Sequence, residues 1–568
     1  MTPHRQPDAL LRAARAASGH LTALCRARLS LAGIAFAAMF AVLGLRVLLL
    51  AAPGGDGRAD VEPVADGEPA GERAAIVDRN GTLLATTLPT SSLYANPNRV
   101  RDPARLARRL DPILPERDAA TLTRRLEREG EFIWLKRDIT PRQHGRIQAL
   151  GSPALGTREE TKRYYPQGKL AGHLVGFTDV DGRGLAGVEK AYGEQLRRRD
   201  EPLRLALDVR VQHALSDELR GAVERYDAKG AAGVVMDART GELVAMTSLP
   251  AFDPAAPDAA PETARFNRAT QGAYEMGSVF KIFAAAAALE SENVRINDRY
   301  SVDEPVRLAD YTVRDFHPLE GELTVPELFM KSSNIGTVKM ARATGAERIT
   351  RTLKKLGLTR RAPLALDAVA DPIMPEPWRR INAMTASYGH GIAVTPVQIA
   401  RAVAATVNGG VLPQPSVRRD VEGDDGRRVL ARPTSRTLRR MMRLVVAYGT
   451  GGKAAADGYR VAGKTGTADK ASHGGYGGDA RVASFAGAFP SDDPRYVIFT
   501  LVDEPKASAA PHGYATGGWV AAPVVRKVVE RVGPLLGIRP NRGFTVPKQA
   551  NNPLLRRARQ KDVQLATR

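Results

Sequence analysis

The sequence predicts a mixed α/β fold that is preceded by one transmembrane helix. Three observations support this: a long apolar run near the N-terminus, a strand pair at residues 230–250, and an alternation of helical and strand patterns that continues to about residue 535. The chain has 568 residues, 43% of them hydrophobic, so it can bury a sizeable core. This length favours several structural units, or two larger domains with tails.

The apolar run extends from Leu29 to Ala52. At about 1.5 Å per residue it is long enough to span the hydrocarbon core of a bilayer. The residues before it carry five arginines and one aspartate, and residues 53–73 carry six acids and two arginines. We therefore expect a single-pass protein of the cytoplasmic (inner) membrane, with residues 1–28 as a basic cytoplasmic tail and the rest outside the cytoplasm. A cleaved signal peptide is the alternative, although its apolar region would be shorter.

The net charge of +21 suits anionic partners such as a membrane surface, a cell-wall polymer or nucleic acid. Nucleic acid is disfavoured, because the basic residues are dispersed and form no basic stripe interleaved with aromatic residues. Cys25 is the single cysteine, so no intrachain disulfide can form. The nine histidines show no paired ligand spacing, and the chain has no phosphate-binding Gly-Lys-Ser/Thr loop. We expect neither a metal nor a cofactor.

Composition divides the chain after the membrane run. Residues 53–72 form a linker rich in Gly, Pro, Asp and Glu. We expect a first domain at 73–215, a second at 216–540, and a basic, disordered tail at 541–568.

Local patterns predict several elements within these domains. "RAAIVDRNGTLLATT" predicts two short strands around a turn at Asn80-Gly81. Residues 103–150 are charged and helical in period, and 202–215 predict a strand that runs into a helix. Residues 230–250 predict a hairpin, because β-branched runs flank Arg239-Thr240-Gly241.

A candidate nucleophile lies in "YEMGSVFK", where Ser278 and Lys281 precede an apolar, Ala-rich run. If a helix begins near Ser278, Lys281 lies one turn further on the same face. The apolar surroundings would exclude water and lower the pKa of Lys281, and a neutral lysine beside a serine is an activated pair. The alternative is a surface serine and a lysine that reaches solvent, since Ser-x-x-Lys alone is a weak motif.

Two further motifs follow, 54 and then 132 residues downstream: Ser332-Ser333-Asn334 and Lys464-Thr465-Gly466-Thr467. Ser332 could relay a proton from Lys281 to a leaving amine, and the Asn334 amide could bind a peptide group. Lys464–Gly466 predicts an edge strand on which a peptide could lie. A period of two puts Thr465 and Thr467 on one face, where they could grip a carboxylate, and turns Lys464 toward the serines.

The order Ser-x-x-Lys, Ser-x-Asn, Lys-Thr-Gly resembles the penicillin-binding proteins and serine β-lactamases. Longer strings, among them "KRYYPQG", "HLVGFTDVDGRGLAGVE" and "GGWVAAPVVRKV", resemble class B penicillin-binding proteins of the division-specific, FtsI-like type. The resemblance covers the chain from Arg73 to about residue 530.

The resemblance implies a penicillin-binding/transpeptidase fold, with an antiparallel sheet flanked by helices, preceded by an elongated, mostly β pedestal domain at 73–215. It implies a serine-type D,D-transpeptidase that cross-links peptidoglycan stem peptides at the division septum and is acylated by β-lactams. The backbone N–H groups of Ser278 and Thr467 would form the oxyanion hole. Implied partners are a membrane-embedded FtsW-type glycan polymerase and other division proteins.

Other functions remain open: an elongation-type class B transpeptidase, a β-lactamase or β-lactam sensor, and an inactive scaffold. "LALDAVADPIMPEP" lacks the Glu and Asn that a class A β-lactamase needs, and three intact motifs argue against a scaffold. Two departures from the family pattern are Val279, where Thr is common, and Trp519, where Tyr is usual. We interpret His390 as a structural turn residue rather than a base.

Overall fold

The computed structural model describes residues 37–41, 73–198, 201–309, 311–419, 426–470, 480–509 and 513–541, with Gly543, Asn552, Leu554 and Leu555. The chain divides into two compact units, Met1–Ala70 and Gly71–Arg568. Residues 37–41 of the first unit are helical. The remainder of the predicted transmembrane helix, the N-terminal tail, the linker 53–72 and most of the C-terminal tail lie outside the described residues. No helix in the described ranges combines the length and the apolar character that a membrane crossing needs.

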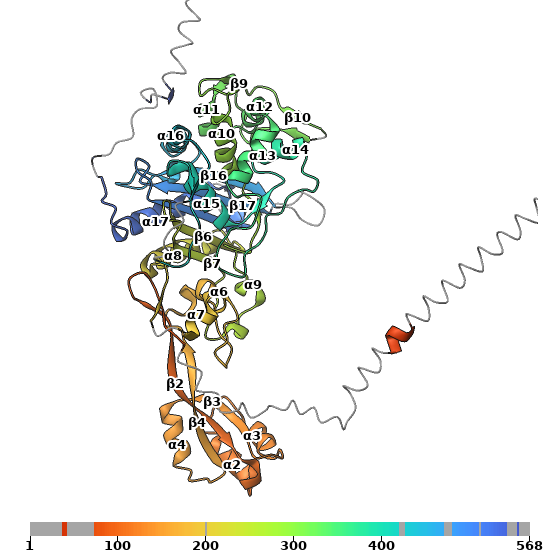
Figure 1. Ribbon diagram of the computed structural model, residues 1–568, viewed down its shortest axis with the longest axis vertical. Helices are drawn as coiled ribbons and strands as arrows, with labels where there is room; N and C mark the ends of the chain where they lie inside the picture. Colours follow the sequence, from red (N-terminus) through yellow and green to blue (C-terminus); the bar gives the residue numbers. More distant parts are fainter. Residues whose placement is uncertain are drawn as a thin grey trace, which may run out of the picture. The chain divides into compact units, whose positions relative to one another are not determined.

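The second unit contains a five-stranded antiparallel sheet in the order β16-β17-β18-β6-β7 (Figure 1). Its strands are β6 (Gly230–Asp237), β7 (Leu243–Leu249), β16 (Ala462–Asp469), β17 (Arg481–Phe489) and β18 (Tyr496–Asp503). The predicted hairpin at 230–250 is confirmed, because β6 and β7 pair antiparallel. Gly241 closes it with a φ of +82°, and a Cβ there would lie 2.1 Å from the Gln414 carbonyl oxygen.

Helices cover both faces of this sheet. Val234 and Met236 pack into one core with helix α15 (Pro396–Val407), whereas Val235 between them packs into a second core with α8 (Val209–Arg225) and α17 (Ala521–Leu535). Strands buried on both faces read as continuous apolar runs, which explains the composition of β6 and β18. The antiparallel sheet flanked by helices agrees with the predicted fold class.

Further helices and two-stranded sheets extend the α15 side of the sheet. The helices are α10 (Lys281–Leu289), α11 (Val325–Lys331), α12 (Asn334–Thr344), α13 (Ala346–Lys355), α14 (Arg380–Ala386) and α16 (Arg432–Tyr448). The paired strands are β8 (Tyr274–Glu275) with β13 (Ala393–Val394), β9 (Arg299–Ser301) with β12 (Glu322–Thr324), β10 (Val306–Leu308) with β11 (Tyr311–Val313), and β14 (Val411–Leu412) with β15 (Arg427–Arg428).

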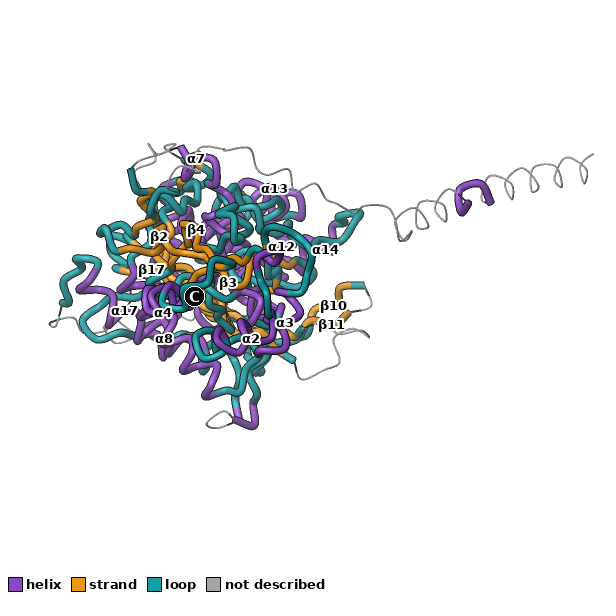
Figure 2. Tube along the Cα trace, turned by 90° about the horizontal axis from the view of Figure 1, so that it is seen from below, coloured by secondary structure: helices purple, strands orange, loops and turns teal. Residues whose placement is uncertain are grey.

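A second five-stranded sheet lies in the N-terminal part of this unit, where β2 pairs with β1, β3 and β4 (Figure 2). Its strands are β1 (Ile76–Val77), β2 (Leu83–Ala95), β3 (Ile133–Ile139), β4 (Leu155–Tyr164) and β5 (Leu203–Arg204). The antiparallel pairing of β1 with β2 confirms the predicted strands around Asn80-Gly81. The strand β5 followed by α8 confirms the pattern predicted at 202–215.

The expectation of a mostly β pedestal is wrong for the residues between 73 and 215. Helices α2–α7 contain more residues than strands β1–β5, which makes this region mixed. The helices are α2 (Pro103–Leu110), α3 (Ala119–Leu126), α4 (Pro141–Gln148), α5 (Gly172–Val175), α6 (Gly187–Ala191) and α7 (Gly193–Arg198), and α9 (Glu262–Arg265) follows further on. The apolar faces of α2 and α3 pack with Leu93 and Leu135 in a separate small core. The helical period predicted for residues 103–150 is confirmed for α2, α3 and α4, but it is wrong for residues 133–139, which form strand β3.

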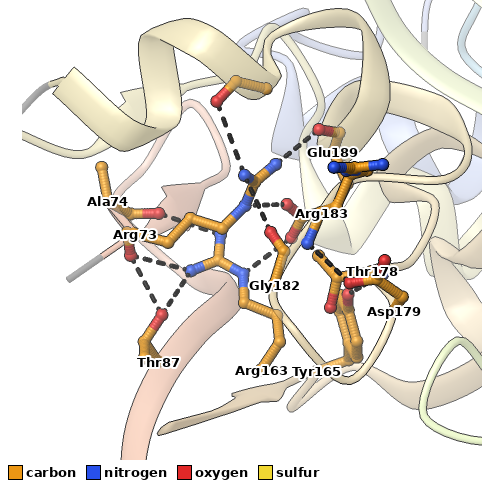
Figure 3. A network of polar contacts seen from close by, with 11 residues as sticks. Arg73, Ala74, Thr87, Arg163, Tyr165, Thr178, Asp179, Gly182, Arg183 and Glu189 are labelled. Carbon is orange, nitrogen blue, oxygen red and sulfur yellow. Dashed lines mark hydrogen bonds and ion pairs between the residues drawn. The ribbon is translucent and has the colours of Figure 1, made fainter. Parts of the chain in front are cut away.

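A buried ion-pair network joins three segments of this region (Figure 3). The Glu189 carboxylate on α6 is fully buried and accepts hydrogen bonds from Arg73 Nε at 2.6 Å and Arg163 Nε at 2.7 Å. Arg163, on β4, also donates from Nη2 to the Ala74 carbonyl at 2.9 Å. Because each charge is paired and hydrogen-bonded, the network fixes the start of the domain to β4 and α6.

Candidate active site

Ser278 lies on a short 3₁₀ turn, η4 (Gly277–Phe280), that leads directly into α10. The predicted helix start near Ser278 is confirmed. Gly277 has a φ of +51°, and a Cβ at this position would lie 2.2 Å from the Thr467 carbonyl oxygen on β16. The glycine therefore lets the main chain beside Ser278 approach the edge strand.

Lys281 is 1% exposed at the start of α10, beneath Ser332 and Asn334. Its Nζ donates to Asn334 Oδ1 at 2.6 Å, to Ser332 Oγ at 3.3 Å and to the Ser332 carbonyl. Burial lowers the pKa of Lys281 to about 7, while the Asp315 carboxylate opposes this shift. The buried, low-pKa lysine predicted from the apolar run is therefore present. In this structure its hydrogen bonds go to Ser332 and Asn334 rather than to Ser278.

Ser332 ends α11 in the left-handed region, with φ 62° and ψ 37°. This conformation is unfavourable for a residue other than glycine and needs support from its surroundings. Its hydroxyl accepts a hydrogen bond from Lys464 Nζ at 2.8 Å, in addition to the one from Lys281. Lys464 is completely buried, and burial, followed by the nearby charge of Lys281, holds its pKa well below the ordinary value. Two amines with weakened basicity thus share one hydroxyl.

Asp315 positions the second motif, and sequence reasoning missed it. Its carboxylate accepts hydrogen bonds from Ser333 Oγ at 2.7 Å, from the Ile335 amide at 3.0 Å and from the Asn334 amide. The carboxylate therefore sits on the positive N-terminal end of α12, where an anion is stabilised. Asn334 is thereby held with its side-chain oxygen on Lys281.

The third motif lies on β16, which is the edge strand of the central sheet, as predicted. Lys464 turns inward to Ser332, while the Thr465 hydroxyl pairs with that of Thr450 at 2.8 Å. Thr467 Oγ1 accepts from the Gly517 amide at 3.0 Å. Gly466 is required between them, because a Cβ there would lie 2.4 Å from the Met276 carbonyl oxygen.

A cleft of about 740 Å³ brings the three motifs together. Ser278, Ser332, Asn334, Thr465 and Thr467 line it, with Lys281 and Lys464 beneath Ser332. His390 also lines the cleft. Its ring stacks with those of Tyr311 and Tyr388, and its Nδ1 lies 3.3 Å from Glu275 Oε2. His390 stands in the predicted turn between two glycines of positive φ, but its side chain also lines the cleft.

Trp519, a departure from the family pattern, also lines the cleft. Lys453 Nζ lies 3.8 Å from the centroid of its ring. Among the residues that the structure describes, no group of three or more His, Cys, Asp or Glu side chains is placed to hold a metal ion.

The models of two protein families match the chain: the penicillin-binding protein transpeptidase domain over residues 231–530, and the penicillin-binding protein dimerisation domain over residues 68–210. The chain is 38% identical to the probable peptidoglycan D,D-transpeptidase FtsI of Caulobacter vibrioides over 83% of its own length and 82% of that protein. It is 32% identical to the peptidoglycan D,D-transpeptidase FtsI of Escherichia coli K12, over 83% and 84% of the two chains.

The fold is also similar to a crystal structure of a peptidoglycan synthetase from Bifidobacterium adolescentis, with a TM-score of 0.65 and 22% identity. That likeness covers 84% of this chain and 98% of the other, and at this identity it shows the fold alone. The transpeptidase model matches more than half of the sequence, and the relatives match over four fifths of both lengths. This chain therefore belongs to the penicillin-binding protein transpeptidase family, in its FtsI-like class B branch.

Proposed function

We propose that this protein is a peptidoglycan D,D-transpeptidase that cross-links stem peptides at the division septum through an acyl-enzyme on Ser278. The observation that carries the proposal is the convergence of Lys281 Nζ and Lys464 Nζ on Ser332 Oγ, in one cleft with Ser278 and beside an edge strand. The names of the FtsI relatives support the same reaction.

In the acylation step, neutral Lys281 accepts the proton of Ser278 as its Oγ attacks the carbonyl carbon of the penultimate residue of the donor peptide. The backbone N–H groups of Ser278 and Thr467 would hold the oxyanion. The C–N bond then breaks, and the leaving amine takes a proton that Ser332 passes on from the lysines. Thr465 and Thr467 would hold the terminal carboxylate of the donor.

In the transfer step, the amine of a second stem peptide attacks the ester carbon, and its proton passes to Lys281. The ester bond to Ser278 breaks as the new amide forms, and Ser278 regains its proton. Both steps need a hydrogen bond between Ser278 Oγ and Lys281 Nζ, with the hydroxyl as donor when Lys281 acts as the base. This contact can form in the substrate complex, because catalytic contacts are often long in the free enzyme.

The setting of this reaction is also part of the proposal. The apolar run 29–52 would anchor the chain in the cytoplasmic membrane and place residues 73–540 outside the cytoplasm, with the first domain at 73–215 and the transpeptidase domain at 216–540. In this setting it would work beside an FtsW-type polymerase and other division proteins. The charge asymmetry on the two sides of the run supports the topology.

Labelling with a fluorescent penicillin tests the chemistry. Mass spectrometry should place the adduct on the peptide that contains Ser278, and Ser278→Ala should remove the label. An adduct on another serine would contradict the assignment. Depletion in the native cell tests the septal role: filaments with unconstricted septa are expected, and swollen cells that still divide would instead assign the protein to elongation.

A further inference from the structure

Lys453 occupies a specific position at one end of the cleft. It lies on the short turn η5 (Gly452–Ala454), is exposed, and holds its Nζ 3.8 Å from the centroid of the Trp519 ring. Trp519 in turn stacks on Tyr514, with centroids 6.0 Å apart and planes 17° apart. None of the carboxylates in the described ranges forms an ion pair with this ammonium group. By contrast, Arg481, which begins β17, is paired at 3.0 Å with Asp469, the last residue of β16.

The side chain of Thr465 faces the same end of the cleft. Its hydroxyl pairs with Thr450, three residues before Lys453, and a Cβ at Gly518 would lie 3.7 Å from Thr465 Cγ2. If Thr465 grips the terminal carboxylate of the donor, the residue that leaves on acylation lies toward Lys453 and Trp519. The part of the donor that stays on Ser278 then extends the other way, toward Asp469.

The direction of the acceptor follows from this. The incoming amine must occupy the position that the leaving amine has vacated, because the two steps are the reverse of one another at the acyl carbon. The acceptor peptide therefore extends from Ser278 past Thr465 toward Lys453. At that end it meets a cation held on an aromatic face, an arrangement that fixes the ammonium group and leaves its N–H donors available for an anion.

We propose that Lys453, supported by Trp519, binds a carboxylate of the acceptor stem peptide and so selects anionic acceptors in the transfer step. The inference rests on the proposed transpeptidase function and adds a subsite to it. It assigns the acceptor to the end of the cleft where Trp519 lies, and it gives that residue a physical role.

The test uses the full chain in detergent, a donor thioester, and two synthetic acceptor peptides with a free side-chain amine. One acceptor keeps its carboxylates, and in the other they are carboxamides. Lys453→Gln should reduce the efficiency of transfer to the anionic acceptor by about tenfold, the size expected for a partly exposed charge-assisted hydrogen bond. Lys453→Gln should have little effect on transfer to the amidated acceptor. The effects of the substitution and of the amidation on the efficiency of transfer should therefore be strongly non-additive.

Three further variants sharpen the test. Lys453→Arg should restore most of the preference, because it keeps the charge, and Trp519→Leu should reduce the preference, because it removes the aromatic support. Lys331→Gln is the matched control: Lys331 on α11 also lines the cleft, and its loss removes the same charge from a different wall. The control should retain the preference for the anionic acceptor.

The rate of acylation by fluorescent penicillin is measured for the same variants, in order to separate effects on the donor from effects on the acceptor. If Lys453→Gln slows acylation and transfer equally, the lysine serves the donor and the inference is overturned. The inference would also be overturned if Lys453→Gln and amidation of the acceptor each lowered the efficiency of transfer independently. In both cases normal acylation of Ser278 in the unmodified protein would leave the transpeptidase proposal intact. Absence of any acylation in the unmodified protein would instead contradict the proposed function itself.

Discussion

Lys281 and Lys464 share one hydroxyl: their Nζ atoms lie 3.3 and 2.8 Å from Ser332 Oγ. Both amines are buried, so loss of water favours their neutral forms, and the charge of Lys281 adds to this effect at Lys464. The site can therefore accept a proton from Ser278 and return one to a leaving amine near neutral pH.

The rate of acylation should rise with pH through about 7. Lys281 is a base only when neutral, and burial lowers its pKa to about 7. Below this value the rate of penicillin labelling should fall by about tenfold per pH unit, and above it the rate should level off. A midpoint near 10, the ordinary range of a lysine, would show that the base does not have a lowered pKa and would contradict the prediction.

Lys281→Ala should reduce acylation of Ser278 by about 10²- to 10⁴-fold, the range for loss of a general base. The high end is expected, because one amine would serve both proton steps. Ser332→Ala should be milder for acylation, since Lys281 remains. The measurement is the rate of penicillin labelling, with circular dichroism to check the fold. Near-normal labelling of Lys281→Ala would show that another group is the base.

Gly277→Ala should disable the nucleophile without unfolding the protein. The new Cβ would lie 2.2 Å from the Thr467 carbonyl oxygen and would occupy a φ of +51°, so the main chain beside Ser278 must move. Displacement at a reacting centre is costly even when it is small. Penicillin labelling should therefore be lost while the melting temperature changes little. Gly193→Ala is the control, because a Cβ there meets nothing within 4 Å; equal labelling of both variants would contradict the prediction.

Glu189→Gln should destabilise the N-terminal part of the second unit by about 3–5 kcal/mol, because it leaves the buried Arg73 and Arg163 guanidinium groups without a counter-charge. Urea unfolding of the full chain in detergent measures the effect. Glu194→Gln breaks exposed pairs with Arg197 and Arg198, which solvent screens, and should leave the free energy of unfolding nearly unchanged. Similar losses for the two variants would show that burial does not decide the strength of these pairs.

The sequence correctly predicted the elements that depend on residues close together in the chain. The hairpin at 230–250, the helix start beside Ser278 and the edge strand with Lys464 each depend on residues close in the chain, and the structure has all three. Asp315 could not be found in this way. It lies on a loop, and nothing nearby in the sequence distinguishes it from a solvated acid until α12 brings Ser333 against it.

Glu189 and Thr450 were missed for the same reason, since their partners Arg73 and Thr465 are defined only by tertiary packing. The error about the mostly β region has a different origin. The charged, helical period of residues 103–150 predicted helices there, and the structure has α2, α3 and α4 in this range, although strand β3 lies between α3 and α4. The resemblance to a family outweighed this local signal, which was correct for most of the range.

The three glycines around β16 restrict how the cleft can change by inherited mutation. A Cβ at Gly277, Gly466 or Gly517 would meet main-chain oxygens at 2.2–2.4 Å, so any of these substitutions displaces backbone rather than a side chain. The nucleophile end therefore tolerates little variation. Side chains that line the cleft and are more than half exposed, such as Tyr311 at 52% and Phe316 at 64%, carry no such constraint. We therefore expect substitutions that alter β-lactam sensitivity but preserve cross-linking to occur at these exposed side chains rather than on β16.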